Sequence, residues 1–392
     1  YWLFASPLCA LTLGIEVITA RRKGEGSEGE CASILRSALV YGFLAGILAY
    51  CLVKLSQPII TARMGVEQTL RSYVDDYVNW RMISIPFFAI SCALRDFFYG
   101  IGESHIDMKA SVLMNAVNFI LCLIFLSVGI INPSIGVKAV AFASSIGTIA
   151  GLLFFLYSAL RSKYNKNGLT SRIGRALVDQ IYNIFMLSWP VAVQSLLGMI
   201  SILFFYRIIS LIGVEELAVT HILSSICSFV FMPVAAIGYG VPIIAGQYLG
   251  AGRKWHAHSC GWTAIFMATV YSVFVCIVFL ILPEWIMKLF TADRKVIELG
   301  AMGLRIMGIA QIFESAGYVI CHLLQGVGMS FWIMAIDSLL TWLVFIPVSY
   351  FFSLRLDLGL LGAWGGWIIY ILFLSLISYL IFKKRRWMEI RV

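Results

Sequence analysis

The sequence predicts an all-α protein that crosses a membrane many times. Hydrophobic residues make up 61% of its 392 residues, charged residues make up only 12%, and the mean hydropathy is +0.92. These values lie far outside the range of soluble globular domains. The apolar residues are also gathered into eleven stretches, each close to the roughly 20 residues that a membrane helix needs. We therefore expect a polytopic membrane protein with eleven spans.

The predicted spans fill almost the whole chain, and short polar breaks separate them. The chain opens with Tyr-Trp-Leu-Phe and has neither a starting Met nor a charged leader or cleavage site, so we expect one further span upstream of residue 1. In chain order the predicted spans cover residues 3–20, 32–54, 76–100, 108–130, 136–160, 183–212, 214–246, 258–283, 297–326, 330–352 and 358–382.

The charged residues of the loops predict the orientation. Lys and Arg near span ends tend to stay in the cytoplasm, and one set of alternate loops holds sixteen of them against eight in the opposite set. This places the C-terminus in the cytoplasm and residue 1 outside. The net charge of +9 is then explained by topology and by anionic lipid headgroups. We expect the lipid bilayer as a partner and no nucleic acid.

The sequence carries no motif of an enzyme or of a metal site. Eight of the nine cysteines lie inside predicted spans without a CxxC or His-Cys cluster, and the five histidines lack ligand spacing. There is no Gly-rich phosphate loop, nucleophile elbow or HExxH motif. We therefore expect no enzymatic activity, no bound metal and no organic cofactor.

An internal repeat of about 225 residues divides the chain into two halves. Leu-Arg-Ile-Met-Gly-Ile at 304–309 resembles Trp-Arg-Met-Ile-Ser-Ile at 80–85, and Leu-Leu-Gln-Gly-Val-Gly at 323–328 resembles Phe-Phe-Tyr-Gly-Ile-Gly at 97–102. Because the offset covers an even number of spans, the halves share one orientation in the membrane. We predict two pseudo-symmetric six-helix lobes, with the first helix missing: an N-lobe at 1–160, a cytoplasmic linker at 161–182 and a C-lobe at 183–392.

Three motifs of the second half resemble the multidrug and toxic compound extrusion (MATE) family, within the MOP flippase and exporter superfamily. They are Ser188-Trp-Pro190, Leu211-Ile-Gly213 and the run from Gly238-Tyr-Gly240-Val-Pro242 to Gly246-Gln247 and Gly250-Ala-Gly252. Residues 14–20 resemble a degenerate copy of the last motif. The resemblance implies a transporter that works by alternating access of two lobes and is driven by a sodium or proton gradient.

The ninth predicted span, at 297–326, carries one polar face, which predicts a wet cavity. At 100° per residue its polar side chains fall within about 80° of arc, and lipid offers such groups no hydrogen bonds. The alternative is an internal hydrogen-bonded network without a transport role. The residues of this face, which we expect to line a substrate cavity, are Gln311, Glu314, Tyr318, His322 and Gln325.

Two acids are predicted to couple transport to a cation. Glu314 lies twelve residues before Gly326, where the resemblance places an acid in several family members, and a carboxylate at bilayer depth calls for a partner, a cavity or a function. Asp337, in the tenth predicted span, is the second candidate. Its alternative role is an ion pair with Arg305 or another base. The coupling ion is either sodium or a proton.

Other acids of the family pattern are absent. Gly198 replaces an acid often found eight residues after the proline of Ser-x-Pro, and Cys122 stands where an aspartate often follows Asn118. Asn115 and Asn118 in the fourth predicted span and Gln194 in the sixth remain as candidate substrate contacts. Amides between membrane helices also serve as packing contacts, so this second reading stays open.

Two arginines are predicted to share one face of the third span and to line the cavity. Arg81 and Arg95 fall within about 80° of each other, and guanidinium groups suit phosphate or carboxylate. This face favours an anionic headgroup as substrate. Alternatively, Arg95 pairs with Glu314 or Asp337 as a gate and Arg81 reaches the outer interface. Asp96 lies about 100° away, and we expect it to neutralise neither arginine.

Prolines and glycines inside the spans are predicted hinges, because proline removes a helical hydrogen bond and favours a kink. The alternative is the ordinary frequency of these residues in membrane helices. The predicted hinge residues are Pro190, Pro233, Gly238, Gly240 and Pro242.

These observations and the resemblance predict a secondary exporter of small amphipathic or cationic compounds in the bacterial inner membrane. We expect a multi-pass monomer that binds a small-molecule substrate. A second possibility is a MOP-type flippase of a lipid-linked or anionic substrate, which Arg81 and Arg95 favour. A third, of another class, is a membrane scaffold that transports nothing.

Overall fold

The computed structural model describes residues 2–63, 68–129, 133–165 and 175–390, and these ranges contain helices and no strand. The chain forms two compact units, which we call the N-unit (Tyr1–Ala192) and the C-unit (Val193–Val392). Along the sequence, the boundary between the units falls within helix α9 (Arg175–Ile212), between Ala192 and Val193. Within the predicted linker 161–182, residues 175–182 are the beginning of that helix, and residues 166–174 lie outside the described ranges.

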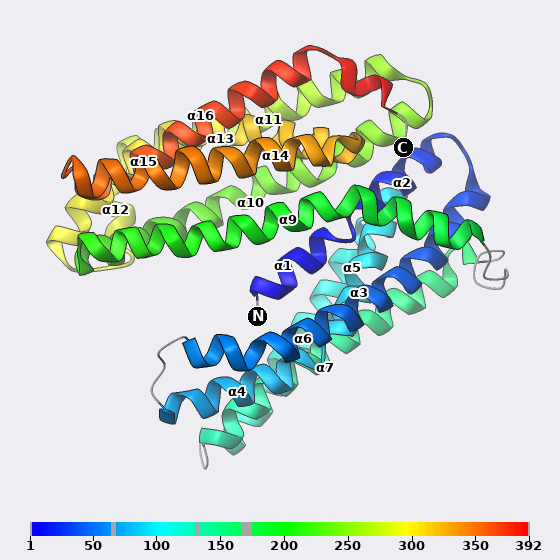
Figure 1. The fold of residues 1–392 in the computed structure, drawn as a ribbon, viewed down its shortest axis with the longest axis horizontal. Coiled ribbons are helices and arrows are strands. Elements are labelled where there is room, and N and C mark those ends of the chain that lie inside the picture. The colour runs from blue at the N-terminus through cyan, green and yellow to red at the C-terminus, as the bar shows by residue number, and fades with distance from the viewer. Residues whose placement is uncertain (1, 64–67, 130–132, 166–174, 391–392) are drawn as a thin grey trace. The chain divides into compact units, whose positions relative to one another are not determined.

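The N-unit contains seven labelled helices and the first part of an eighth. Helices α6 and α7 pack against each other most extensively and run side by side (Figure 1). The helices are α1 (Trp2–Ala10), α2 (Leu13–Gly24), α3 (Glu28–Arg63), α4 (Gln68–Met82), α5 (Ile85–Gly100), α6 (His105–Gly129), α7 (Pro133–Arg161) and the part of α9 (Arg175–Ile212) that precedes Val193.

One predicted span of the N-unit is bent instead of straight. The span at 76–100 consists of α4 and α5, which meet at 47°. Pro86 occupies the first turn of α5, where its missing N–H is tolerated, but it cannot continue a helix that arrives from α4. Ser84 stabilises the corner because its hydroxyl donates to the carbonyl oxygen of Arg81 at 2.7 Å. The span predicted at 76–100 is therefore present as a bent pair of helices, and a face calculated for one continuous helix does not apply to it.

The C-unit begins with the second part of α9 and continues to the end of the chain (Figure 1). Short π-helical turns follow α13, α14 and α15, at Gln325–Met329, Thr341–Phe345 and Phe351–Arg355. The helices are α10 (Val214–Gly250), α11 (Lys254–Ile281), α12 (Pro283–Lys288), α13 (Arg294–Leu324), α14 (Ser330–Leu340), α15 (Ile346–Tyr350), α16 (Gly359–Lys383) and a short 3-10 turn (Arg386–Glu389).

The described helices account for the eleven predicted spans. Nine stretches are long and apolar enough to cross a membrane, and the bent α4–α5 pair adds a tenth. One of the nine, Arg294–Arg355, has 62 residues and would be about 90 Å long as a straight helix, roughly three times the thickness of a bilayer core. It is interrupted at Gly328, whose φ is 103°, and therefore contains two spans. The chain is a multi-pass membrane protein.

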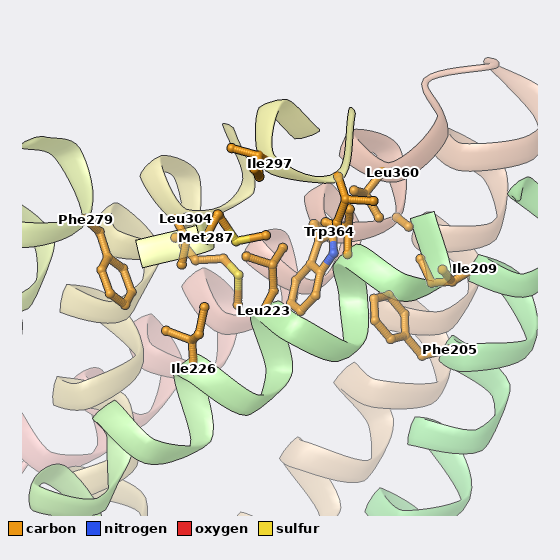
Figure 2. Packing of buried hydrophobic residues seen from close by; sticks show 14 of the residues in the cluster. Phe205, Ile209, Leu223, Ile226, Phe279, Met287, Ile297, Leu304, Leu360 and Trp364 are labelled. Carbon is orange, nitrogen blue, oxygen red and sulfur yellow. The ribbon is translucent and has the colours of Figure 1, made fainter. Parts of the chain in front are cut away.

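Two apolar clusters build the C-unit and leave a polar layer between them. The first cluster joins α9, α10, α11, α13 and α16 through residues such as Phe205, Leu223 and Trp364 (Figure 2). On α13 this cluster ends at Met307, and the second cluster resumes at Val319. The part of α13 between these two residues carries the polar face predicted from the sequence, so packing above and below fixes its position.

Glycine conformations match the internal repeat. Gly26 and Gly102 of the N-unit have φ values of 75° and 81°, and Gly252 and Gly328 of the C-unit have φ values of 74° and 103°. Gly252 follows Gly26 by 226 residues, and Gly328 follows Gly102 by the same distance. Left-handed backbone favours glycine, so the same two chain reversals occur at equivalent places in both halves. The repeat seen in the sequence is therefore also a repeat of structure.

Candidate functional site

The polar face of α13 opens into a cavity of about 250 Å³ in the C-unit. Six of its lining residues were predicted from the sequence, four of them because helical spacing brings residues of one face together. Gly317 allows α13 and α16 to approach closely at the cavity wall, since a Cβ there would lie 2.2 Å from Ser375 Oγ of α16. The predicted residues that line this cavity are Glu314, Tyr318, His322, Gln325, Gln194 and Asp337.

Asp337 is held in a hydrogen-bonded network at one end of the cavity. Gln194 Nε2 donates to its Oδ2 at 2.6 Å, and the Tyr370 hydroxyl donates to its Oδ1 at 2.5 Å. Gln325 Nε2 in turn donates to Gln194 Oε1 at 2.7 Å. The alternative ion pair with Arg305 is absent among the described residues. Both oxygens of the Asp337 carboxylate therefore have a hydrogen-bond donor.

Glu314 is placed differently from Asp337. No residue in the described ranges forms a hydrogen bond or ion pair with its carboxylate, although its side chain is largely covered by protein. It lines the first cavity and also a second one, of about 430 Å³, which contains Gln311, Phe231 and Trp367. A buried carboxylate without a partner favours binding a proton or a cation. Glu314 is therefore the group of this site best placed to change its charge.

The second cavity is largely aromatic. The ring of Phe205 packs against the rings of Phe345 and Trp364, with centroid distances of 5.2 Å and 5.3 Å. Aromatic faces attract organic cations, and the attraction strengthens when water is excluded. Gln311 is 1% exposed, and its Nε2 has no hydrogen-bond partner. The cavity therefore offers apolar contact, an acid and an unused amide donor to a ligand.

The rings of Tyr318 and His322 pack against each other at a tilt of 46° in the wall of the cavity that Glu314 lines. Their ring centroids are 4.2 Å apart, and His322 also contacts Tyr239 at 5.2 Å. Tyr318 lies directly against α10, because a Cβ on Gly238 would come within 2.5 Å of the Tyr318 ring. Gly238 therefore sets the position of Tyr318 in the cavity wall.

The two predicted hinge glycines of α10 should respond differently to alanine. Gly238→Ala should lower the free energy of unfolding by about 1–3 kcal/mol or displace Tyr318, whereas a Cβ at Gly240 meets no atom within 4 Å. Gly240→Ala should therefore stabilise the helix by up to about 1 kcal/mol. Detergent unfolding of both variants tests this, and equal losses of stability would contradict it. If Gly240 is a hinge, Gly240→Ala will slow transport without lowering stability.

The other hinge residues lie within unbroken helices. The structure has α9 continuous through Pro190, and α10 continuous through Pro233 and Pro242. The irregular turns of the C-unit occur at Gln325–Met329 and on both sides of Pro347. The role of Pro190, Pro233 and Pro242 as hinges stays a prediction.

The arginine face predicted in the N-unit is not formed as expected. Arg81 belongs to α4 and donates to the hydroxyls of Ser84 at 2.6 Å and Thr148 at 3.3 Å, on the far side of the bend from Arg95. Arg95 Nε and Nη2 lie 2.9 Å and 2.8 Å from Asp96 Oδ1. The expectation that Asp96 neutralises neither arginine is therefore wrong. The long Arg side chain can fold back to its sequence neighbour, which a count of helical phase does not allow for.

The remaining predicted contacts are in the N-unit and in α9. Asn118 Nδ2 donates to Ser144 Oγ of α7 at 2.9 Å, which joins two helices. Asn115 is exposed on α6. A Cβ at Gly198 would meet no atom within 4 Å, so the position where the family often has an acid is open.

Tyr370 and Glu16 were missed as site residues in the sequence, and Asp96 was considered only as a partner of the two arginines. Tyr370 of α16 donates to Asp337, and it interrupts an otherwise apolar span, which is a usable signal. Glu16 and Asp96 are 5% and 3% exposed in the N-unit. Each is an acid inside a predicted span, so the rule that intramembrane acids are functional or paired should have included them.

Comparisons with known proteins agree with this architecture. The MatE family model matches residues 1–124 and 190–351. A probable multidrug resistance protein NorM of Thermotoga maritima is 25% identical over 99% of this chain and 83% of its own length. The probable multidrug resistance protein YoeA of Bacillus subtilis is 21% identical over 92% of this chain and 79% of its own length.

Solved structures show the same fold. A crystal structure of MATE in the bent conformation has a TM-score of 0.88 and 18% identity, and covers 98% of this chain and 84% of its own. The MATE transporter ClbM in complex with Rb⁺ has a TM-score of 0.83 and 19% identity, with coverage of 99% and 86%. Because the family model matches well over half of the chain, and the described helices carry the expected repeat, this protein belongs to the MatE family.

Proposed function

We propose that the protein is a secondary active exporter of small amphipathic or cationic compounds, coupled to a sodium or proton gradient by alternating access of its two lobes. The observation that carries this proposal is Glu314, a carboxylate that faces two cavities and has no partner among the described residues. It can take up a cation from one side and bind the positive charge of a substrate instead. Competition of two cations for one acid couples their movements.

The cavity chemistry supports the substrate class. Aromatic side chains suit flat apolar molecules, and the neighbouring carboxylate favours positive charge. The names of the curated relatives also refer to multidrug resistance. We extend this proposal to a monomer in the bacterial inner membrane with its C-terminus in the cytoplasm, in line with the basic loops.

The flippase alternative has less support than the sequence suggested. It depended on two guanidinium groups available to an anionic headgroup. Arg81 instead contacts two hydroxyls at the α4–α5 bend, and Arg95 is paired with Asp96. No observation favours a scaffold that transports nothing.

Transport by purified protein in liposomes tests the proposal. A cationic dye should cross the liposome membrane faster when a proton or sodium gradient is imposed. Each ion is tested alone. Efflux that depends on one gradient supports an exporter and identifies the ion. Efflux that no gradient changes, or competition by lipid-linked anions instead of cations, would contradict it.

A further inference from the structure

The N-unit contains a buried acid that the proposed C-unit site does not use. Glu16 lies on α2 between Ile15 and Val17 and is 5% exposed. No hydrogen bond or ion pair joins its carboxylate to any residue in the described ranges. An ionised carboxylate in such a place would carry a large desolvation cost. Glu16 therefore needs either a counter-charge or a proton.

The nearest cation is already committed to another acid. Helices α3, α5 and α9 pack against α2, and the charged groups that act on Glu16 electrostatically are Arg95 and Asp96 of α5. Two nitrogens of Arg95 contact the same oxygen of Asp96, at 2.8 Å and 2.9 Å. The guanidinium and this carboxylate neutralise each other, which leaves Glu16 beside a pair of no net charge.

The same cluster has a connection to a cavity. Arg95 lines a cavity of about 150 Å³ together with Ser91, Ser111 and Asp107. Asp107 accepts a hydrogen bond of 2.5 Å from Tyr99. A polar cavity of this size can hold more than one water molecule. Protons can therefore reach the Arg95–Asp96 pair that adjoins Glu16.

This cavity is the N-unit counterpart of the Glu314 cavity, but its acids stand elsewhere. Ser111 and Phe88 line it at positions 226 residues before Asp337 and Glu314. The repeat thus places a hydroxyl and an aromatic ring where the C-unit has its two acids. In the N-unit, the lining acid is Asp107 of α6, and Arg95 connects the cavity to Asp96.

We propose that Glu16 is a second proton-binding site, which is protonated while Arg95 is paired with Asp96 and which releases its proton when Arg95 turns toward it. The proposal rests on the proposed function, because it adds a second proton to each transport cycle. With one guanidinium for two acids, a proton must be present whenever the cluster is neutral. The net charge of the cluster of Glu16, Arg95 and Asp96 is then set by the protonation of Glu16.

Infrared spectroscopy of the protein in lipid tests the proposal without transport. The carboxylic-acid carbonyl band at neutral pH should be weaker in Glu16→Gln than in the wild type by the absorbance of one acid. Glu28→Gln is the matched control, since Glu28 is an exposed acid paired with Lys163, and it should leave the band unchanged. An unchanged band in Glu16→Gln would overturn the proposal.

A second variant covers failure of Glu16→Gln to fold. Asp96→Asn removes the acid that competes for Arg95, so Glu16 should ionise and the same band should be lost although Glu16 is present. If the band persists in Asp96→Asn, the pairing argument is wrong and the proposal fails.

Transport then separates this inference from the proposed function. If Glu314 carries a proton, the number of protons moved per substrate in liposomes should fall about twofold in Glu16→Gln, and if Glu314 carries sodium, proton movement should be lost. Substrate should still move in both cases. Wild-type protein without gradient-driven efflux would contradict the proposed function itself. Wild-type efflux with an unchanged proton ratio in Glu16→Gln would contradict only the second site.

Discussion

Glu314→Gln should lower gradient-driven efflux by about tenfold or more, a loss of at least 1.4 kcal/mol in coupling. Glutamine keeps the shape of the side chain but can neither bind a proton nor offer a negative charge. Since no partner in the described ranges holds the Glu314 carboxylate, the variant should also fold as well as the wild type. Efflux from liposomes and thermal unfolding in detergent together measure both effects.

Two variants serve as comparisons for Glu314→Gln. Glu298 lies on the same helix, is 66% exposed at its side chain and pairs with Arg294, so Glu298→Gln should change nothing. Asp337→Asn keeps one oxygen that can accept from Gln194, and its new amide can donate to the hydroxyl oxygen of Tyr370, so its effect on stability should be small. Full efflux in Glu314→Gln, or an equal loss in Glu298→Gln, would show that the acid of the cavity is not the coupling group.

Phe382→Ala should lower the free energy of unfolding by about 3 kcal/mol, at the lower end of the range for large aromatic residues. Phe382 is fully buried and packs against the rings of both His258 and Trp387, with centroids 5.2 Å and 5.6 Å away. Helices in lipid associate through close packing instead of transfer from water, so the cavity left behind accounts for most of the loss.

Phe373 is the matched control for Phe382, because it lies on the same helix and is 48% exposed. Phe373→Ala removes the same atoms without opening a cavity inside the protein. Unfolding of both variants in mixed micelles provides the comparison. Equal losses of stability would show that the cluster around Phe382 does not hold α11, α16 and the C-terminal turn together.

The sequence predicts the spans well because each one depends on local composition. Long apolar runs and polar breaks are properties of a single segment, and the repeat adds a second independent indication. The polar face of α13 was also predictable, since residues of one helix face follow from their spacing alone. In the structure, Glu314, Tyr318, His322 and Gln325 line one cavity.

Contacts between helices were less predictable. The partner of Asp337 is Tyr370, 33 residues away, and no spacing rule connects them. The bend between α4 and α5 placed Arg81 and Arg95 on different helix axes, so their calculated common face does not exist. The pairing of Arg95 with Asp96 depends on side-chain length and on the scarcity of other partners in a buried site.

Simultaneous measurement of cation uptake and dye efflux in the same liposomes tests the central claim most directly. We expect wild-type protein to take up protons or sodium ions only when substrate is present, in a fixed ratio to the substrate released, and Glu314→Gln to lose both movements together. Substrate release by Glu314→Gln at the wild-type rate, or cation uptake that substrate does not change, would contradict a coupling role for this acid.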